Sequence, residues 1–222
     1  MAAIKAGFKS FDEAAGGLEM QKIYSLIGNK ESGKEEFLYK LVSSALSSKT
    51  PVVYVTTSRS YSDLINEFNS RHLPVSQYLG ADFMIFDDFS KISSPNVQDT
   101  NYAKILNGPL DLTGLSVALS AADGNYLKDG RSVFNVIDSV SNLLVYSNPS
   151  TIFRFLQFIC GRSKMSGATT LFSLDSEMHP PEVTETIKSM SDGVISLKLD
   201  NGARYFTFTG STKEILKWTE LN

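Results

Sequence analysis

The chain has 222 residues, 42% of them hydrophobic, and a formal net charge of -3 at pH 7. This composition predicts one globular domain over residues 1–222, and the mild acidity argues against a nucleic-acid binder that relies on overall positive charge. No apolar run reaches the roughly 18 residues of a membrane span, and the N-terminus lacks the apolar stretch of a secretory signal. We therefore expect a cytoplasmic protein with no membrane partner. The single cysteine, Cys160, excludes an internal disulfide and is expected to be a buried apolar filler.

The first part of the chain alternates apolar runs with amphipathic segments. Its apolar runs show no period-two alternation, which is typical of strands covered on both faces of a sheet. The predicted strands are 23–27, 52–56 and 83–86, and the predicted helices are 35–46 and a segment from Ser60 through Phe68.

The middle of the chain is less regular. Residues 87–111 are polar and predict a loop with room for one short helix, in which Asp87 and Asp88 form a solvated turn or a cap rather than a metal pair. A helix is expected over 111–119. Asp-Gly pairs at Asp123 and Asp129 predict turns before the next strand, 133–137.

The rest of the chain predicts a helix over 150–162, a strand over 170–174 and a helix from Pro181. Residues 194–209 predict a hairpin, because Asn201-Gly202 separates two alternating segments, and a short strand or tail follows at 214–219. This order predicts an α/β fold: a mostly parallel central sheet flanked by helices, with an antiparallel hairpin at one edge.

Residues 28–35 form a degenerate phosphate-binding loop (Walker A motif). The motif requires Gly, four residues, then Gly-Lys followed by Ser or Thr; Gly28, Gly33 and Lys34 fit it and Glu35 does not. The loop lies between a predicted strand and a predicted helix, where backbone N–H groups and the helix dipole favour phosphate. The candidate nucleotide-binding residues are Gly28, Asn29, Lys30, Glu31, Ser32, Gly33, Lys34 and Glu35.

A second element supports a nucleotide site. The apolar run 133–138 ends in Asp138, and a carboxylate at the end of a buried strand is the usual ligand of the magnesium ion that bridges the phosphates. The same aspartate could instead cap the following helix. We take Asp138 as the candidate metal ligand.

Three segments resemble the KaiC and RadA-paralogue branch of the RecA-like ATPases, which is abundant in archaea. They are the N-terminal FKSFDEAAGGL (8–18), VIDSVSNL (136–143) and SMSDGVISLKLDNG (189–202). The resemblance covers nearly the whole chain. It implies a RecA-like fold, ATP with magnesium bound at subunit interfaces, and often hexamers or filaments.

The resemblance also implies residues that this chain lacks. Active members carry Thr or Ser where Glu35 stands, and one or two glutamates just after the second strand, where residues 55–59 hold no carboxylate. Two like charges 4 Å apart cost about 4 kcal/mol at an effective dielectric near 20, so Glu35 opposes phosphate binding. Glu35 and Glu36 suit the first turn of a helix and could fill the electropositive place themselves. We assign no catalytic residue and expect little or no ATP hydrolysis.

Four functions follow as hypotheses. The first is an inactivated RecA-like protein that serves as a regulatory or scaffold partner of another protein or paralogue. The second is a functional ATPase, favoured by Lys34 and Asp138. The third is a recombination accessory that binds single-stranded DNA, and the fourth is a peptide- or protein-binding module.

Overall fold

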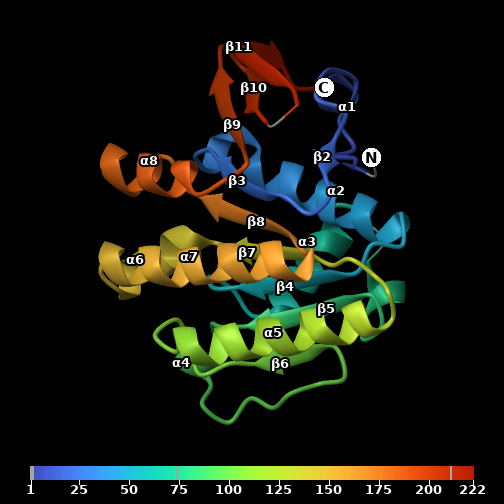
Figure 1. Cartoon of the computed structure of the whole chain (residues 1–222), viewed down its shortest axis with the longest axis vertical. Helices are drawn as coiled ribbons and strands as arrows, with labels where there is room; N and C mark the ends of the chain where they lie inside the picture. Colours follow the sequence, from blue (N-terminus) through green and yellow to red (C-terminus); the bar gives the residue numbers. More distant parts are fainter. Residues whose placement is uncertain (1–2, 74, 211) are drawn as a thin grey trace.

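The computed structural model describes residues 3–73, 75–210 and 212–222 and contains a nine-stranded sheet (Figure 1). In sheet order the strands are β11 (Glu214–Glu220), β10 (Ala203–Thr209), β9 (Gly193–Asp200), β3 (Ile23–Ile27), β8 (Thr169–Leu174), β7 (Phe134–Asp138), β4 (Val52–Thr56), β5 (Phe83–Asp87) and β6 (Ala103–Ile105). Strands β9, β3, β8, β7, β4, β5 and β6 are parallel, and β10 and β11 extend the sheet antiparallel. The predicted α/β fold with its hairpin edge is confirmed.

Helices cover both faces of this sheet. One face packs against α1 (Lys9–Ala14), α2 (Lys34–Ser47) and α3 (Tyr61–Ser70). The other packs against α5 (Leu112–Lys128), α6 (Val140–Tyr146), α7 (Pro149–Ser166) and α8 (Pro181–Ser189). Successive strand residues serve opposite faces: Tyr24 and Leu26 belong to the first core, and Ile23 and Ile27 to the second. This double coverage explains the continuous apolar runs.

Several short elements complete the fold. They are β1 (Ala3–Ile4) and β2 (Leu18–Glu19), which form a small separate sheet, α4 (Ser90–Ser93), and the 3-10 turns η1 (Lys30–Ser32) and η2 (Ser76–Tyr78). The hairpin turn has the expected conformation, because Asn201 and Gly202 both have positive φ angles, 49° and 80°. Among the described residues, no helix is long and apolar enough to cross a membrane.

Two predictions about the middle of the chain are wrong. The segment 87–111 contains the one short helix for which the prediction left room, α4, but it also contains the edge strand β6, which was not predicted. Asp123-Gly124 is not a turn but lies inside α5, where the buried Asp123 pairs with Arg162 at 2.8 Å and accepts a hydrogen bond from Asn135. These tertiary contacts outweigh the local turn preference. The helix α6 was not predicted at all.

Asp87 and Asp88 do not form a solvated turn, since both are buried. Asp87 is a cap, the other predicted role, and accepts hydrogen bonds from the backbone N–H groups of Tyr61, Phe89 and Ser90. Burial, reinforced by the charges of Asp111 and Asp87, raises the pKa of Asp88 to about 7 against the opposing effect of the Gly108 N–H.

Candidate functional site

The predicted site residues converge at the carboxyl edge of the parallel strands. Strands β3, β8, β7 and β4 are neighbours, so their ends bring Gly28, Leu174, Asp138 and Thr56 to one edge of the sheet. Ligands of open α/β sheets bind outside this edge. The structure thus brings the loop 28–35 and Asp138 to the same region, as their sequence patterns predict.

The loop 28–35 is held by hydrogen bonds between its own residues. Asn29 accepts a hydrogen bond from the Ser32 N–H through its side chain at 3.0 Å, and the Ser32 hydroxyl donates to the Asn29 carbonyl at 2.6 Å. A Cβ on Gly28 would lie 2.4 Å from the Ser32 hydroxyl oxygen, which explains the glycine. Lys30 and Glu31 are exposed on the outside of this turn.

The segment after β8 is joined to this loop. The Asn29 amide donates to Glu177 at 2.7 Å, and the Ser176 N–H donates to the Gly28 carbonyl at 3.4 Å. The same segment is tied to α6, because the Asp175 N–H donates to the Ser141 hydroxyl at 2.8 Å. The loop is therefore connected to the segment after β8 and, through that segment, to α6.

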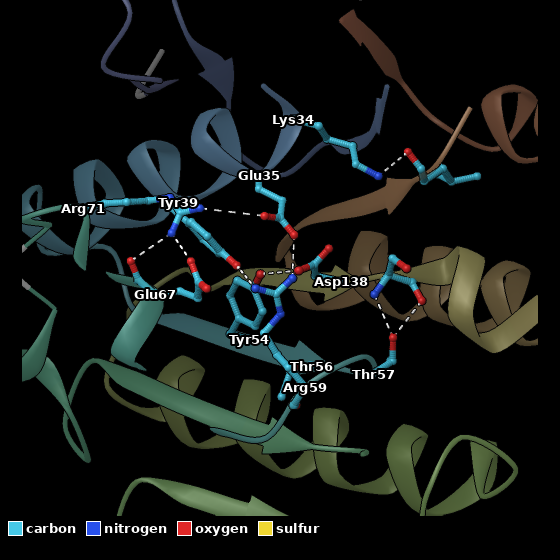
Figure 2. A network of polar contacts seen from close by, with 12 residues as sticks. Lys34, Glu35, Tyr39, Tyr54, Thr56, Thr57, Arg59, Glu67, Arg71 and Asp138 are labelled. Atoms are coloured by element: carbon cyan, nitrogen blue, oxygen red, sulfur yellow. Dashed lines mark hydrogen bonds and ion pairs between the residues drawn. The ribbon is translucent and has the colours of Figure 1, made fainter. Parts of the chain in front are cut away.

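Lys34 points inward and is buried. Its ammonium group donates a hydrogen bond to the Leu174 carbonyl at 2.8 Å, at the end of β8 (Figure 2). Burial lowers the pKa of Lys34, although the charges of Asp138, Asp175 and Glu35 oppose that effect. One donor of the lysine expected to bind phosphate is thus already used within the chain.

Glu35 forms an ion pair with Arg59, whose guanidinium nitrogen lies 2.5 Å from its carboxylate (Figure 2). Arg71, at the end of α3, lies 3.8 Å from the other carboxylate oxygen of Glu35 and also pairs with Glu67. Arg59 donates a second hydrogen bond to the Tyr39 hydroxyl at 2.9 Å. Residues from α2, α3 and the loop after β4 are therefore joined around the Glu35 side chain.

Asp138 is buried and accepts a hydrogen bond from the Tyr54 hydroxyl at 2.6 Å. Burial raises the pKa of Tyr54 well above its usual value, and the charge of Asp138 raises it further. Burial alone would lower the pKa of Arg59, but Tyr39, Glu35 and Asp138 outweigh burial and raise it. The guanidinium of Arg59 thus lies under the influence of both carboxylates, Glu35 and Asp138.

The residues just after β4 serve structural roles. The Thr57 hydroxyl donates to the Ser139 carbonyl at 3.0 Å and accepts from the Ser139 N–H at 2.8 Å. The Asn142 amide donates to the Thr57 carbonyl at 2.6 Å. These bonds join β4 to β7 and leave Arg59 as the charged group of this turn.

Glu36 contacts β10 rather than the loop after β4. It pairs with Arg204 and, at 3.1 Å, with Lys40. Burial would raise the pKa of Glu36, but hydrogen bonds from Arg204 and Lys40 lower it. A polar cavity of about 320 Å³ lies here; its lining is Lys30, Gly33, Glu35, Glu36, Lys40, Arg71, Leu73 and Arg204.

The residues present do not fit a magnesium ion. In phosphate-binding loops the ion is held by the Ser or Thr hydroxyl after the lysine and by the strand-end aspartate. Here Glu35 occupies the position of the Ser or Thr after the lysine, and its carboxylate is paired with Arg59. One carboxylate oxygen of Asp138 accepts a hydrogen bond from the Tyr54 hydroxyl. Within the part of the chain that the structure describes, no group of three or more His, Cys, Asp or Glu side chains could hold a metal ion.

The family assignment follows from a match over residues 4–216 to the family described as "ATPase: KaiC". The chain belongs to the KaiC family of ATPases. Within the matched range, the loop 28–35 lies between β3 and α2, and Asp138 is the last residue of β7. No curated protein matches the chain.

Two solved structures from Pyrococcus horikoshii are similar in fold. A KaiC-like protein of the OT3 strain has a TM-score of 0.71 at 18% identity, covering 99% of this chain and 93% of that one. An uncharacterized protein in complex with an unknown peptide has a TM-score of 0.77 at 14% identity, covering 98% of this chain and 94% of that one. At these identities the likeness shows the fold alone.

Sequence reasoning did not find Arg59, Tyr39, Tyr54 and Arg71 as parts of the site. One signal was available: the stretch 55–59, where the resemblance implies a glutamate, ends in Arg59, whose charge is opposite to that of the unexpected Glu35. Two unexpected residues of opposite charge, both at positions of the family's site motifs, indicate that their side chains meet. The tyrosines carry no such signal, because their aromatic rings fit a buried core equally well.

Proposed function

We propose that this KaiC-family domain is a non-hydrolysing regulatory or scaffold subunit, acting through a protein partner. The observation that carries the proposal is the ion pair between Arg59 and Glu35, the last residue of the loop 28–35. It holds a cation and a carboxylate of the chain itself in the region where nucleotide phosphates and their metal would be bound.

Two further observations support the proposal. The turn after β4 offers Arg59 in place of a carboxylate that could orient an attacking water, and loss of such a base costs roughly 100- to 10,000-fold in rate. Lys34 is held by the Leu174 carbonyl, so phosphate would have to compete with an existing hydrogen bond. The Glu35–Arg59 ion pair and the engaged Lys34 therefore disfavour binding of ATP with magnesium. The lack of a carboxylate just after β4 disfavours its hydrolysis.

Release of inorganic phosphate from ATP and magnesium tests the proposal. We expect the unsubstituted protein to hydrolyse ATP no faster than the Lys34→Met variant, because that substitution removes the lysine on which phosphate binding by the loop would depend. Turnover by the unsubstituted protein that Lys34→Met abolishes would overturn it. Comparison with Lys30→Met, an exposed lysine of the same loop, shows whether a difference is specific to the buried lysine.

Peptide binding is a second candidate, supported by the structural neighbour that was crystallised with an unknown peptide. A cavity of about 810 Å³, lined mainly by apolar side chains, lies between β5, β6 and α5. Met84 and Phe86 line it from β5, and Val117 and Ala121 from α5. This volume lies within the range of ligand pockets and would hold apolar side chains of a peptide.

Selection from a random peptide library, followed by fluorescence anisotropy, tests this candidate. Ala121→Trp fills the cavity, and we expect it to weaken a selected peptide by at least about tenfold, or 1.4 kcal/mol. Ser120→Trp adds the same ring on an exposed position of the same helix outside the cavity lining, and should leave the affinity unchanged. Equal affinities for all three proteins would place the peptide elsewhere.

A further inference from the structure

Arg59 approaches both positions that would hold the metal ion in a phosphate-binding loop. Its guanidinium is 2.5 Å from Glu35, which replaces the hydroxyl residue, and it interacts with the charge of the strand-end Asp138. Figure 2 shows this guanidinium facing Glu35, with Asp138 and its partner Tyr54 beside it. A cation of this chain is therefore paired with Glu35 and lies near Asp138.

The guanidinium is held firmly at this position. Its side chain is 22% exposed, and it donates to the Tyr39 hydroxyl at 2.9 Å as well as to Glu35. The backbone of its turn is also fixed, because the Arg59 carbonyl accepts a hydrogen bond from the Thr56 hydroxyl at 2.8 Å. A planar, permanently charged group with several donors can pair with a carboxylate and donate to a neighbouring hydroxyl at the same time.

We infer that Arg59 is the cation of this site in place of a divalent metal ion. The site then excludes Mg²⁺, and whatever the loop 28–35 binds, it binds without a bridging metal. Glu35 and Arg59 depend on each other, because the guanidinium of Arg59 neutralises the carboxylate that Glu35 brings to the site. This inference rests on the proposed non-hydrolysing function.

Removal of the guanidinium should create a metal site. Without Arg59, the carboxylate of Glu35 loses the cation 2.5 Å from it, and Asp138 stays in the same region of the site with only the more distant Arg71 and the engaged Lys34 as cations. Carboxylate oxygens are the preferred ligands of Mg²⁺ and Mn²⁺. Removal of Glu35 instead would leave the guanidinium beside Asp138, and the place of the cation would still be taken.

Titration with Mn²⁺, followed by the electron paramagnetic resonance signal of the free ion, tests the inference without any enzymatic readout. The unsubstituted protein and Glu35→Thr should bind no Mn²⁺ in the millimolar range, with or without ADP. Arg59→Gln should bind Mn²⁺ at least about tenfold more tightly than either, and Arg59→Gln with Asp138→Asn should lose that gain. Circular dichroism of each variant confirms that it is folded.

Arg71→Gln is the matched control. Arg71 also approaches Glu35, at 3.8 Å, but pairs with Glu67 on α3, so its removal should create no metal site. Binding of Mn²⁺ by the unsubstituted protein overturns the inference and needs no variant. An equal gain in Arg71→Gln and Arg59→Gln overturns it too. Neither result depends on ATP hydrolysis, so failure of the inference is distinguishable from failure of the proposed function.

Discussion

The Tyr54 hydroxyl donates a 2.6 Å hydrogen bond to the Asp138 carboxylate. It joins the middle of β4 to the end of β7, two neighbouring parallel strands. Tyr54 is fully buried, so its hydroxyl group needs a hydrogen-bond partner within the protein, and that partner is Asp138 of the candidate site. The candidate metal ligand is thereby tied to the packing of the sheet.

Tyr54→Phe should reduce the free energy of unfolding by about 1–3 kcal/mol, because it leaves a buried carboxylate oxygen of Asp138 without its donor. Urea denaturation followed by circular dichroism measures the change. Tyr205→Phe, which removes the same atom from a half-exposed ring on β10, should change the stability by less than about 0.5 kcal/mol. Equal effects of the two substitutions would contradict the role of this hydrogen bond.

Arg59→Met should destabilise the fold by about 1–3 kcal/mol, because Glu35 would lose the cation 2.5 Å from its carboxylate and the Tyr39 hydroxyl would lose its donor. The value is below that of a fully buried pair because the Glu35 side chain is 40% exposed. Thermal denaturation at low and high salt measures it, and added salt should reduce the loss. Arg154→Met removes an exposed arginine of α7 and serves as the control. A loss no larger than in that control would count against the network.

Asp88 predicts a pH dependence of stability. Its folded pKa of about 7 lies above its unfolded value, so the folded state binds the extra proton and is favoured at low pH. This contribution should be fully present below about pH 4 and lost as the pH rises through about 7, by up to about 4 kcal/mol at about 1.4 kcal/mol per pKa unit.

Asp88→Asn should therefore flatten the stability profile between about pH 4 and about pH 7 and stabilise the protein above that range. Urea midpoints across the range measure this. Asp129→Asn, at an exposed position, should leave the profile unchanged. An Asp88→Asn profile that still falls with rising pH would show that another group is responsible.

Gly33→Ala should destabilise the protein by more than Gly202→Ala. Both glycines have φ near +80°, which costs roughly 1–2 kcal/mol for a residue with a Cβ. At Gly202 the added carbon would meet open space, whereas at Gly33 it would lie 2.7 Å from Arg204 and displace that side chain from Glu36. Thermal denaturation of the two variants gives the difference. If Arg204→Ala does not reduce it, the contact with Arg204 is not its cause.

Most strands and helices could be predicted from the sequence because their signals are local. The runs 23–27 and 52–56 became β3 and β4 with the same bounds, and Asn201-Gly202 formed the expected turn. The failures lie where distant partners decide. β6 has three residues and exists through its pairing with β5, and Asp123 stays helical because Arg162 and Asn135 satisfy its carboxylate.

The sequence by itself determined the family and the places of the loop 28–35 and Asp138, because spacing, strand ends and helix starts are written locally along the chain. It also determined that Glu35 breaks the motif. Only the tertiary structure decided what Glu35 does, since its partner Arg59 is 24 residues away, on a turn that sheet order brings beside α2. A charge is attractive or repulsive according to its neighbours, and those neighbours are chosen by the fold.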